Sequence, residues 1–507
     1  MADNTEKNTE NTSAGTAQAS SVDPRELIER TPKGLFIDGG FVAAEDGETF
    51  EGFNPADGSV LTEVAAGSEA DSRRAVDSIC AAQDSWAATA PRERSEILRR
   101  AFELLGERSE ELALLQTLEL GRALKDSAAE VGYGAEFFRW FAEEAVRPRG
   151  EYRVSPDGKS RILVAEQPVG PCLAITPWNF PLAMGARKIA PALAAGCTML
   201  VKPASKTPLT MLYLAQVLKE AGLPDGVLAV VPAKKASNVS ALVDDARVRK
   251  FTFTGSTAVG QQLAAEAAGH SMKVSLELGG NAPYIVAADA DLDTAAQAVA
   301  VAKMRGAGQV CIAANRFLVH ESVAEEFTAK VAELMGSLTI GPGNGAGVDY
   351  GPLSGTDQVE TVSGLVDDAL DKGARRIVGG ELPEGLPEGG YYYPATVLTD
   401  LPADAEILHN EIFGPVVAVD TFATDDEAVE KANSTPFGLA AYVFSENLTH
   451  ALALAERVEA GMVALNKGGL SDPAAPFGGV KESGLGREGG FQGIHEYLEE
   501  KFISVPR

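Results

Sequence analysis

Apolar positions along the chain follow two different spacings. Through residues 69–145 they recur every three to four positions, as in "PRERSEILRRAFELLGERSEELALLQTLELG", which is the period of a helix with one buried face. From residue 160 onward, short and evenly apolar runs alternate with amphipathic segments. We therefore predict helices over 69–145, followed by strands and helices in turn.

The apolar runs after residue 160 are short and rich in β-branched residues, as strands are. They read "ILVAEQPVGPCLAIT", "CTMLVKP", "VLAVVP" and "KFTFTG". The helical segments between and after them read "PLAMGARKIAPALAAG", "TPLTMLYLAQVLKEAG", "KKASNVSALVDD" and "STAVGQQLAAEAA". Strands that are apolar on both faces indicate a parallel sheet covered by helices on both sides. A second α/β unit is expected from about 281 to 470.

Two segments lack this pattern. Residues 1–22 are polar and almost free of apolar anchors, so we predict a disordered tail that is not a secretory signal. Residues 150–168, with "EYRVSPDGKSRILVAEQ", resemble a two-stranded ribbon around a Pro-Asp-Gly turn. Because an isolated hairpin is marginally stable in water, this ribbon is expected to dock on a partner subunit.

Charge and cysteine content narrow the possible functions. The 507 residues carry 44 basic and 72 acidic side chains, a formal net charge of −28, which disfavours nucleic acid and anionic membranes as partners. The cysteines are far apart and only five histidines are present, so we expect neither a metal site nor a disulfide framework. No run approaches the roughly 20 apolar residues of a membrane span. A cytoplasmic protein of two or three domains is expected.

Four positions carry candidate chemistry, and each has a plain structural alternative. In "RGAGQVCIAANR", Cys311 has glycines on one side, which suits a nucleophile, and apolar residues on the other, which suits a packing cysteine. Gly255 and Ser256 open a helix after a strand, where phosphate binds readily, but an ordinary capped turn looks the same. Lys202 ends a strand and is either a ligand-binding or a surface lysine. Glu277 in "KVSLELGGNAP" is either a general base or a solvated carboxylate.

Taken together, the motifs resemble those of the NAD(P)-dependent aldehyde dehydrogenase superfamily. The matching segments are "TPWNFP", "VKPAS", "FTGSTAVG", "LELGGNAP", "GQVCIAANR", "EIFGPV" and "PFGGVKESGLGREGG". Their order and spacing cover nearly the whole chain after the tail. Within the superfamily the chain is most similar to succinate-semialdehyde dehydrogenases, through "FPLAMGARK", "AKMRGAGQVC" and "APFGGVKESGLGREGGFQGIHEYLE".

The resemblance assigns catalytic roles to three of these residues. Cys311 would be the nucleophile that forms a thiohemiacetal with the aldehyde and then a thioester. The side-chain amide of Asn179 and the backbone N–H of Cys311 would form the oxyanion site. Glu277 would activate the water that hydrolyses the thioester.

For the cofactor, the resemblance implies NADP or NAD. Lys202 would bind the adenosine ribose, Glu411 the nicotinamide ribose, and Phe413 would lie near the nicotinamide ring. Gly255 and Ser256 would lie by the pyrophosphate, and Trp178 and Ser205 complete the set. NAD-preferring relatives often have glutamate in place of Ser205, so we expect NADP to be preferred, helped by Lys202 and Lys206. Alternatively, Lys206 points to solvent and both cofactors work equally.

A semialdehyde substrate also needs cationic groups for its far carboxylate. The resemblance to succinate-semialdehyde dehydrogenases points to Arg187, Arg305 and Ser471. Arg187 is expected two turns along a helix opened by Asn179, facing the same entrance. The alternative for each arginine is a salt bridge at the surface or at an interface.

The expected architecture is the α/β aldehyde dehydrogenase fold. A Rossmann-like cofactor domain would comprise 23–149 and 169–280, and an α/β catalytic domain 281–475, while 150–168 and 485–507 would be oligomerisation arms of a homodimer or homotetramer. The expected reaction is oxidation of succinate semialdehyde to succinate. Two alternatives stay open: another aldehyde, such as glutarate semialdehyde or a neutral aldehyde, or a non-catalytic structural role.

Overall fold

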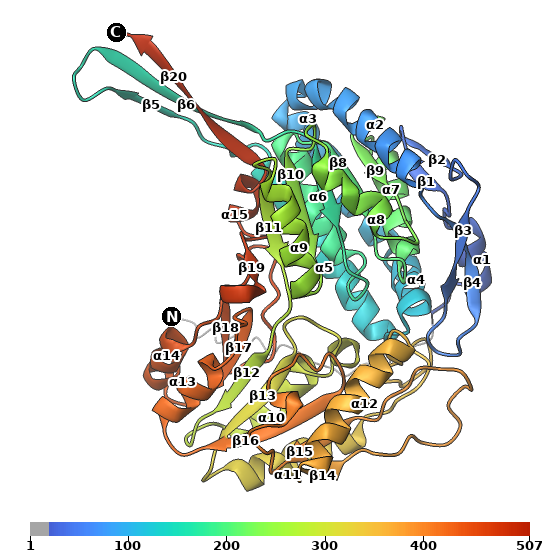
Figure 1. The fold of residues 1–507 in the computed structure, drawn as a ribbon, viewed down its shortest axis with the longest axis vertical. Coiled ribbons are helices and arrows are strands. Elements are labelled where there is room, and N and C mark those ends of the chain that lie inside the picture. Colours follow the sequence, from blue (N-terminus) through green and yellow to red (C-terminus); the bar gives the residue numbers. More distant parts are fainter. Residues whose placement is uncertain (1–19) are drawn as a thin grey trace, which may run out of the picture.

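The computed structural model describes residues 20–507, which form two α/β units and a projecting ribbon (Figure 1). Residues 1–19, and with them most of the predicted tail, lie outside the described residues. At the start of the described residues, the backbone N–H of Ser21 donates to the Glu110 carboxylate at 2.6 Å. Helix α1 (Pro24–Arg30) follows, and then a two-stranded sheet of β3 (Thr49–Phe53) and β4 (Val60–Ala65).

The first α/β unit is built on an eight-stranded sheet with the order β19-β11-β10-β7-β8-β9-β1-β2. Its strands are β1 (Leu35–Ile37), β2 (Gly40–Val42), β7 (Cys172–Ile175), β8 (Met199–Lys202), β9 (Leu228–Val230), β10 (Lys250–Thr254), β11 (Lys273–Glu277) and β19 (Gly484–Leu485). The five strands from β11 to β9 are parallel, which confirms the predicted parallel sheet, and the edges are antiparallel.

Both faces of this sheet are buried, because successive residues of each strand enter different cores. In β7, Cys172 and Ala174 join a core with α3 to α7, whereas Leu173 and Ile175 join one with α2 and α9. This is the physical reason why these strands read as continuous apolar runs. The helices are α2 (Glu69–Ala88), α3 (Pro91–Glu107), α4 (Ser109–Leu120), α5 (Leu124–Glu144), α6 (Ala183–Ala195), α7 (Pro208–Glu220), α8 (Ser237–Ser240) and α9 (Thr257–Ala268).

Two helices differ from the sequence-based expectation. The helix expected in "KKASNVSALVDD" is only the four-residue α8, followed by a 3-10 turn at Ala241–Asp244. Asn179 does not open a helix: it lies in a bend, and α6 begins at Ala183. Arg187 is therefore in the second turn of α6.

The second α/β unit has a seven-stranded sheet with the order β14-β15-β16-β13-β12-β17-β18. Its strands are β12 (Ala282–Val286), β13 (Ala314–His320), β14 (Arg375–Val378), β15 (Thr396–Thr399), β16 (Val416–Phe422), β17 (Ala440–Phe444) and β18 (Met462–Leu465). All neighbouring pairs are parallel except β14 with β15. Its helices are α10 (Leu292–Ala302), α11 (Ala324–Ser337), α12 (Thr356–Asp371), α13 (Asp425–Asn433) and α14 (Leu448–Arg457).

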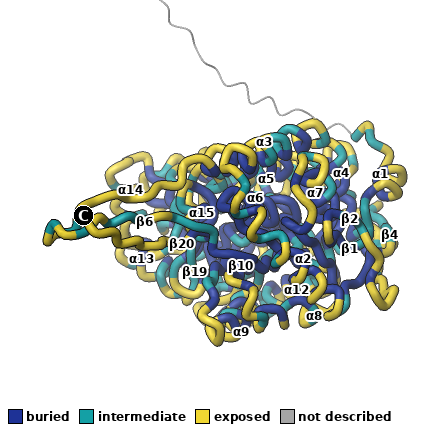
Figure 2. The backbone as a smooth tube through the Cα atoms, turned by 90° about the horizontal axis from the view of Figure 1, so that it is seen from above, coloured by how far each residue is buried: buried dark blue, intermediate teal, exposed yellow. Residues whose placement is uncertain are grey.

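The projecting ribbon is a three-stranded sheet of β5 (Glu151–Val154), β6 (Ser160–Pro168) and β20 (Leu498–Pro506), the last preceded by α15 (Gln492–His495). β5 and β6 pair antiparallel around the turn at 155–159, which confirms the predicted hairpin. The C-terminal strand β20 lies along the whole of β6 (Figure 1). The ribbon is largely exposed (Figure 2), and Tyr152 and Phe502 retain 65% and 62% of their accessible surface.

The two units meet where strand ends converge. β8, β10 and β11 end at Lys202, Thr254 and Glu277, and the chain then passes through Gly279 and Gly280 into the second sheet. Ligands in open α/β sheets bind at such carboxyl ends. Among the helices of residues 20–507, none combines the length and apolar character needed to cross a bilayer. The proposed domain boundaries stay a prediction.

Candidate active site

Cys311 lies on a short loop that leads into β13. The preceding turn, Arg305–Gly308, runs through left-handed backbone at Gly306 (φ 58°), Ala307 (φ 56°) and Gly308 (φ 77°). A side chain at position 308 would collide with the backbone of Gly414 in the "EIFGPV" segment. The glycine side of the motif thus lets two backbone segments approach closely, and the apolar side, from Ile312 onward, is buried.

Cys311 lines two cavities. The larger has a volume of about 280 Å³, which is enough to hold part of a dinucleotide. Among its lining residues are Trp178, Asn179, Gly255, Ser256, Glu277, Glu411 and Phe413. The smaller, about 20 Å³, is lined by Tyr133, Phe180, Met184, Arg187, Arg305, Val310, Ile312, Ser471 and Phe477 as well as Cys311. The structure therefore brings together residues as far apart in the chain as Tyr133 and Phe477.

The Asn179 side chain is held beside the Cys311 loop. Its Nδ2 donates to the backbone carbonyl of Gln309 at 3.0 Å, and the residue is 6% exposed. One N–H of the same amide therefore remains for another acceptor. The amide and Cys311 line one cavity, an arrangement compatible with an oxyanion site.

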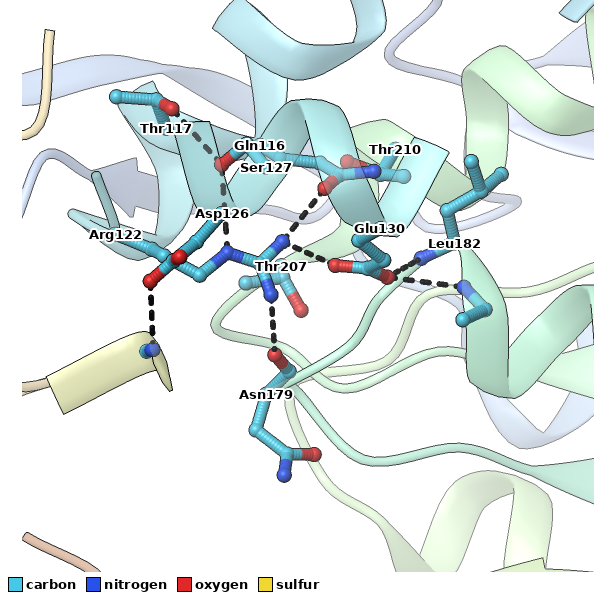
Figure 3. A network of polar contacts seen from close by, with 12 residues as sticks. Gln116, Thr117, Arg122, Asp126, Ser127, Glu130, Asn179, Leu182, Thr207 and Thr210 are labelled. Atoms are coloured by element: carbon cyan, nitrogen blue, oxygen red, sulfur yellow. Dashed lines mark hydrogen bonds and ion pairs between the residues drawn. The ribbon is translucent and has the colours of Figure 1, made fainter. Parts of the chain in front are cut away.

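A buried polar network from α5 and the turn before it supports the Asn179 loop (Figure 3). Arg122 donates from Nη1 to the backbone carbonyl of Asn179 at 3.3 Å and forms an ion pair with Glu130. Glu130 accepts from the backbone N–H groups of Leu182 and Ala183 at 3.0 and 2.9 Å, so it caps α6 from a different helix. In Figure 3 the Asn179 amide points away from this network.

The same region reaches the Cys311 approach. Asp126, in the first turn of α5, accepts from the backbone N–H of Gly306 at 2.8 Å. Arg122 and Asp126 thus contact both loops that carry the candidate catalytic groups. Nothing in the local sequence "LELGRALKDSAAE" indicated this, because the partners are distant in the chain.

Glu277 ends β11 and is 3% exposed, so the solvated-carboxylate alternative is wrong. Its Oε2 is buried and has no hydrogen-bond partner among residues 20–507. Burial raises the pKa of this carboxyl well above its ordinary value, the nearby Glu488 adds to the rise, and Arg187 and Lys188 oppose it. A carboxyl that retains protons at higher pH is suited to proton transfer near neutrality.

Burial also controls the Cys311 thiol. It raises the pKa of the thiol to about 12, with the guanidinium of Arg187 acting in the opposite direction. In the structure as it stands the thiol is therefore protonated at neutral pH. Forming the nucleophilic thiolate requires a base beside it or a change in its surroundings.

Most predicted cofactor-binding residues line the larger cavity, whereas Lys202 ends β8 and Ser205 lines a separate cavity. Lys202 is 6% exposed, and burial lowers its pKa to about 8. Within residues 20–507 its Nζ donates only to the carbonyl of Pro203, at 3.1 Å. Ser256 occupies the N-cap of α9 but makes no side-chain hydrogen bond there, which contradicts the alternative of an ordinary capped turn. Thr257 Oγ1 is buried without a partner in the described chain. The start of α9 thus fits an incoming phosphate better than a capped turn.

Glu411 and Phe413 approach the cavity from the second unit. Glu411 accepts from the N–H of Gly280 at 3.4 Å, and burial raises its pKa to about 8 while Lys303 opposes the shift. Phe413 has φ 51° and its ring lies edge-on to Trp178 at 5.5 Å. Lys303 is the C-cap residue of α10 and is fully buried. The sequence did not indicate that it lies near Glu411.

Lys206 is placed differently from either expectation. It forms an ion pair with Asp357 at 2.8 Å and lies 5.4 Å from the Trp178 ring. It is therefore neither free for a cofactor phosphate nor directed into solvent alone. Ser205 is exposed beside it.

The smaller cavity contains the predicted carboxylate-binding residues. Arg187 is 1% exposed, which excludes the surface alternative; its Nε pairs with Glu488, and the guanidinium lies 3.9 Å from the Phe477 ring. Its Nη1 and Nη2, and Nε of Arg305, have no partner within residues 20–507. Lys188 also pairs with Glu488, so this group of three keeps one net positive charge. Such unpaired donors are suited to an anion.

No cluster of three or more metal-ligating side chains occurs in the described chain.

The chain matches the family model described as "Aldehyde dehydrogenase family" over residues 41–503. It is 53% identical to a succinate-semialdehyde dehydrogenase of Paenarthrobacter nicotinovorans, over 88% of this chain and 99% of that protein. It is 44% identical to a glutarate-semialdehyde dehydrogenase of Pseudomonas aeruginosa, over 93% and 97% of the two chains. A crystal structure of an E. coli NADP-dependent enzyme matches with a TM-score of 0.92 and 42% identity, covering 95% and 99%.

Proposed function

This chain belongs to the aldehyde dehydrogenase family, and from that premise we propose that it oxidises succinate semialdehyde to succinate. One observation carries the proposal: Cys311 lines both a cavity of cofactor-binding type and a pocket with two arginines that have buried, unpaired N–H groups. A nucleophile in this position can reach an aldehyde whose far end is anionic. Similarity to the Paenarthrobacter succinate-semialdehyde dehydrogenase supports succinate semialdehyde, rather than a longer semialdehyde, as the substrate.

We assign the steps to residues as follows. The Cys311 thiolate attacks the aldehyde carbon, and the Asn179 amide with the Cys311 N–H stabilises the oxyanion of the thiohemiacetal. NADP or NAD would supply the acceptor for the hydride that the thiohemiacetal loses when it becomes the Cys311 thioester. Glu277 then takes a proton from the water that attacks the thioester, and succinate leaves.

The cofactor would be held by groups from both units. Lys202 and Ser205 would bind the adenosine ribose, Gly255 and Ser256 the pyrophosphate, and Glu411 the nicotinamide ribose, with Trp178 and Phe413 beside the ring. The unpaired Thr257 hydroxyl and the uncapped start of α9 support this fit.

Glutarate semialdehyde is the main competing substrate, since a relative named for it is 44% identical. A turnover panel of semialdehydes of increasing length, together with neutral aldehydes, separates the possibilities. Highest kcat/KM with succinate semialdehyde supports the proposal, and a preference for the longer semialdehyde or for neutral aldehydes contradicts it.

Replacing Arg187 or Arg305 with alanine should raise KM for succinate semialdehyde by about 10- to 100-fold, because each change removes charged donors to the far carboxylate. KM for butanal, a neutral aldehyde of the same length, should change much less. Steady-state kinetics with both aldehydes and a thermal unfolding curve check the expectation. Equal losses on both substrates would mean that the arginines have only structural roles.

For the cofactor we propose that NADP is accepted and preferred. Ser205 carries no charge that would repel a 2′-phosphate, and Lys202 is buried and unpaired by any carboxylate in the described chain. Lys206 contributes less than the sequence suggests, because Asp357 neutralises it.

Ser205→Glu should shift the ratio of kcat/KM values toward NAD by about 10-fold, or about 1.4 kcal/mol, because the new carboxylate repels a 2′-phosphate. The measurement is kcat/KM with each cofactor at saturating aldehyde. Ser337→Glu, an exposed change on α11, adds the same charge elsewhere and should leave the ratio unaltered. An unmodified enzyme that favours NAD more than about 10-fold would reject the NADP preference.

We propose further that the ribbon of β5, β6 and β20 joins subunits into a homodimer or homotetramer. Exposed apolar side chains on it, Tyr152, Val154, Phe502, Ile503 and Val505, would be covered by a second copy. A cytoplasmic location is part of the proposal, since reducing conditions keep a thiol nucleophile available.

A further inference from the structure

Tyr133, on α5, presents a hydroxyl group whose proton has no hydrogen-bond acceptor among the described residues. The side chain lines the smaller cavity together with Arg187, Arg305 and Ser471. Its hydroxyl oxygen is buried and has no hydrogen-bond partner among the described residues. Its ring packs edge-on against Phe137, with 4.9 Å between ring centres. A phenylalanine would pack there equally well, so the hydroxyl is the feature that needs a reason.

An unpaired buried hydroxyl costs stability, and native proteins generally satisfy such groups. Its oxygen can accept a hydrogen bond from a guanidinium, but Arg187 and Arg305 cannot satisfy the hydroxyl proton, because their guanidinium groups can only donate hydrogen bonds. Their unpartnered atoms are Arg187 Nη1 and Nη2 and Arg305 Nε. The group that would pair with a cluster of donors is one that only accepts, and an ionised carboxylate is such a group.

Charge favours the same ligand. Glu488 pairs with both Arg187 and Lys188, which leaves one positive charge on this group of three, and Arg305 adds another. A neutral aldehyde would leave the buried N–H groups of both arginines without a partner, which is unfavourable. A carboxylate at the far end of the substrate would pair with both arginines.

We propose that Tyr133 is a substrate-specificity residue whose hydroxyl donates a hydrogen bond to the far carboxylate of the substrate, beside Arg187 and Arg305. This inference rests on the proposed semialdehyde activity and adds a donor that the sequence did not suggest. Tyr133 acts on the non-reacting end of the substrate. Its removal should therefore affect substrates according to their charge and leave the chemistry at Cys311 unaltered.

The test is Tyr133→Phe, which removes one oxygen and keeps the ring. We expect kcat/KM for succinate semialdehyde to fall about 10- to 100-fold, the range for a hydrogen bond to a charged group. We expect kcat/KM for butanal to stay within about 2-fold, and the inhibition constant of succinate to rise in parallel with the first loss. The melting temperature should change little, because the hydroxyl proton has no acceptor among the described residues.

A matched control is Tyr392→Phe, since the Tyr392 hydroxyl donates to the carbonyl of Ala56 at 2.9 Å, outside both cavities. This variant should lose stability and keep the ratio of the two kcat/KM values. If Tyr133→Phe lowers both substrates equally, or neither, the inference is overturned while the proposed function stands. If the unmodified enzyme itself does not prefer succinate semialdehyde to butanal, the proposed function fails, and the role of Tyr133 fails with it.

Discussion

Replacing Cys311 with alanine should lower aldehyde oxidation by at least about 1000-fold, the scale on which loss of a nucleophile acts in covalent enzymes. Alanine cannot form the thiohemiacetal, and no other described cysteine lines either cavity. Cofactor affinity should stay close to that of the unmodified protein, because the proposed ribose and phosphate ligands are unchanged. Reduced-cofactor release and a cofactor titration of the same preparation give the two measurements.

Cys80 provides the matched control. It is a free, partly buried cysteine of α2, remote from both cavities, so Cys80→Ala should turn over at the normal rate. Turnover near the unmodified rate in Cys311→Ala would remove Cys311 from the mechanism. Loss of activity in both variants would point to a general effect of cysteine replacement.

Glu277→Gln should retain a first burst of hydride transfer and slow steady-state turnover by about 100- to 10,000-fold. The carboxyl is buried, has no hydrogen-bond partner in the described chain, and has a raised pKa. Glutamine keeps the size of the side chain but cannot take a proton from water. The acyl-enzyme should therefore accumulate.

Rapid mixing that follows reduced cofactor separates the burst from the later turnover. Glu333→Gln, on the exposed face of α11, makes the same chemical change away from the site and should leave both phases intact. A missing burst with normal substrate binding would mean that Glu277 acts earlier, for example by deprotonating Cys311. An unaltered steady state would exclude it as the base.

Some features of the site were predictable because they depend on local pattern. Strands that are apolar on both faces predicted a parallel sheet covered by helices. The polar residues at the strand ends, Lys202 and Glu277, lie at the carboxyl edge of this sheet. Glycine on one side of Cys311 indicated a close approach of backbone, which Gly414 provides. In each case the requirement acts on neighbouring residues and leaves a trace in the sequence.

Other features depend on partners that are far apart in the chain. Glu130 caps α6 from another helix, so no capping residue marks the start of α6 and its beginning was misplaced. Asp357 neutralises Lys206 from 151 positions away. Glu488 pairs with Arg187 across 301 positions. The role of a buried charge or hydroxyl group depends on such distant contacts. The role proposed for Tyr133 depends on the absence of a hydrogen-bond partner for its hydroxyl among the described residues.

The order of strands has a consequence for the nascent protein on the ribosome. β6 cannot pair with β20 until β20 is synthesised, about 330 positions later, and the edge of β11 likewise stays unpaired until β19 is synthesised. At about 5 to 20 residues per second this delay lasts roughly 15 to 65 seconds. During that time the sheet edge and the apolar side chains of the hairpin are unpaired, a condition that favours aggregation. Completion of the first unit is therefore expected only after translation is almost finished.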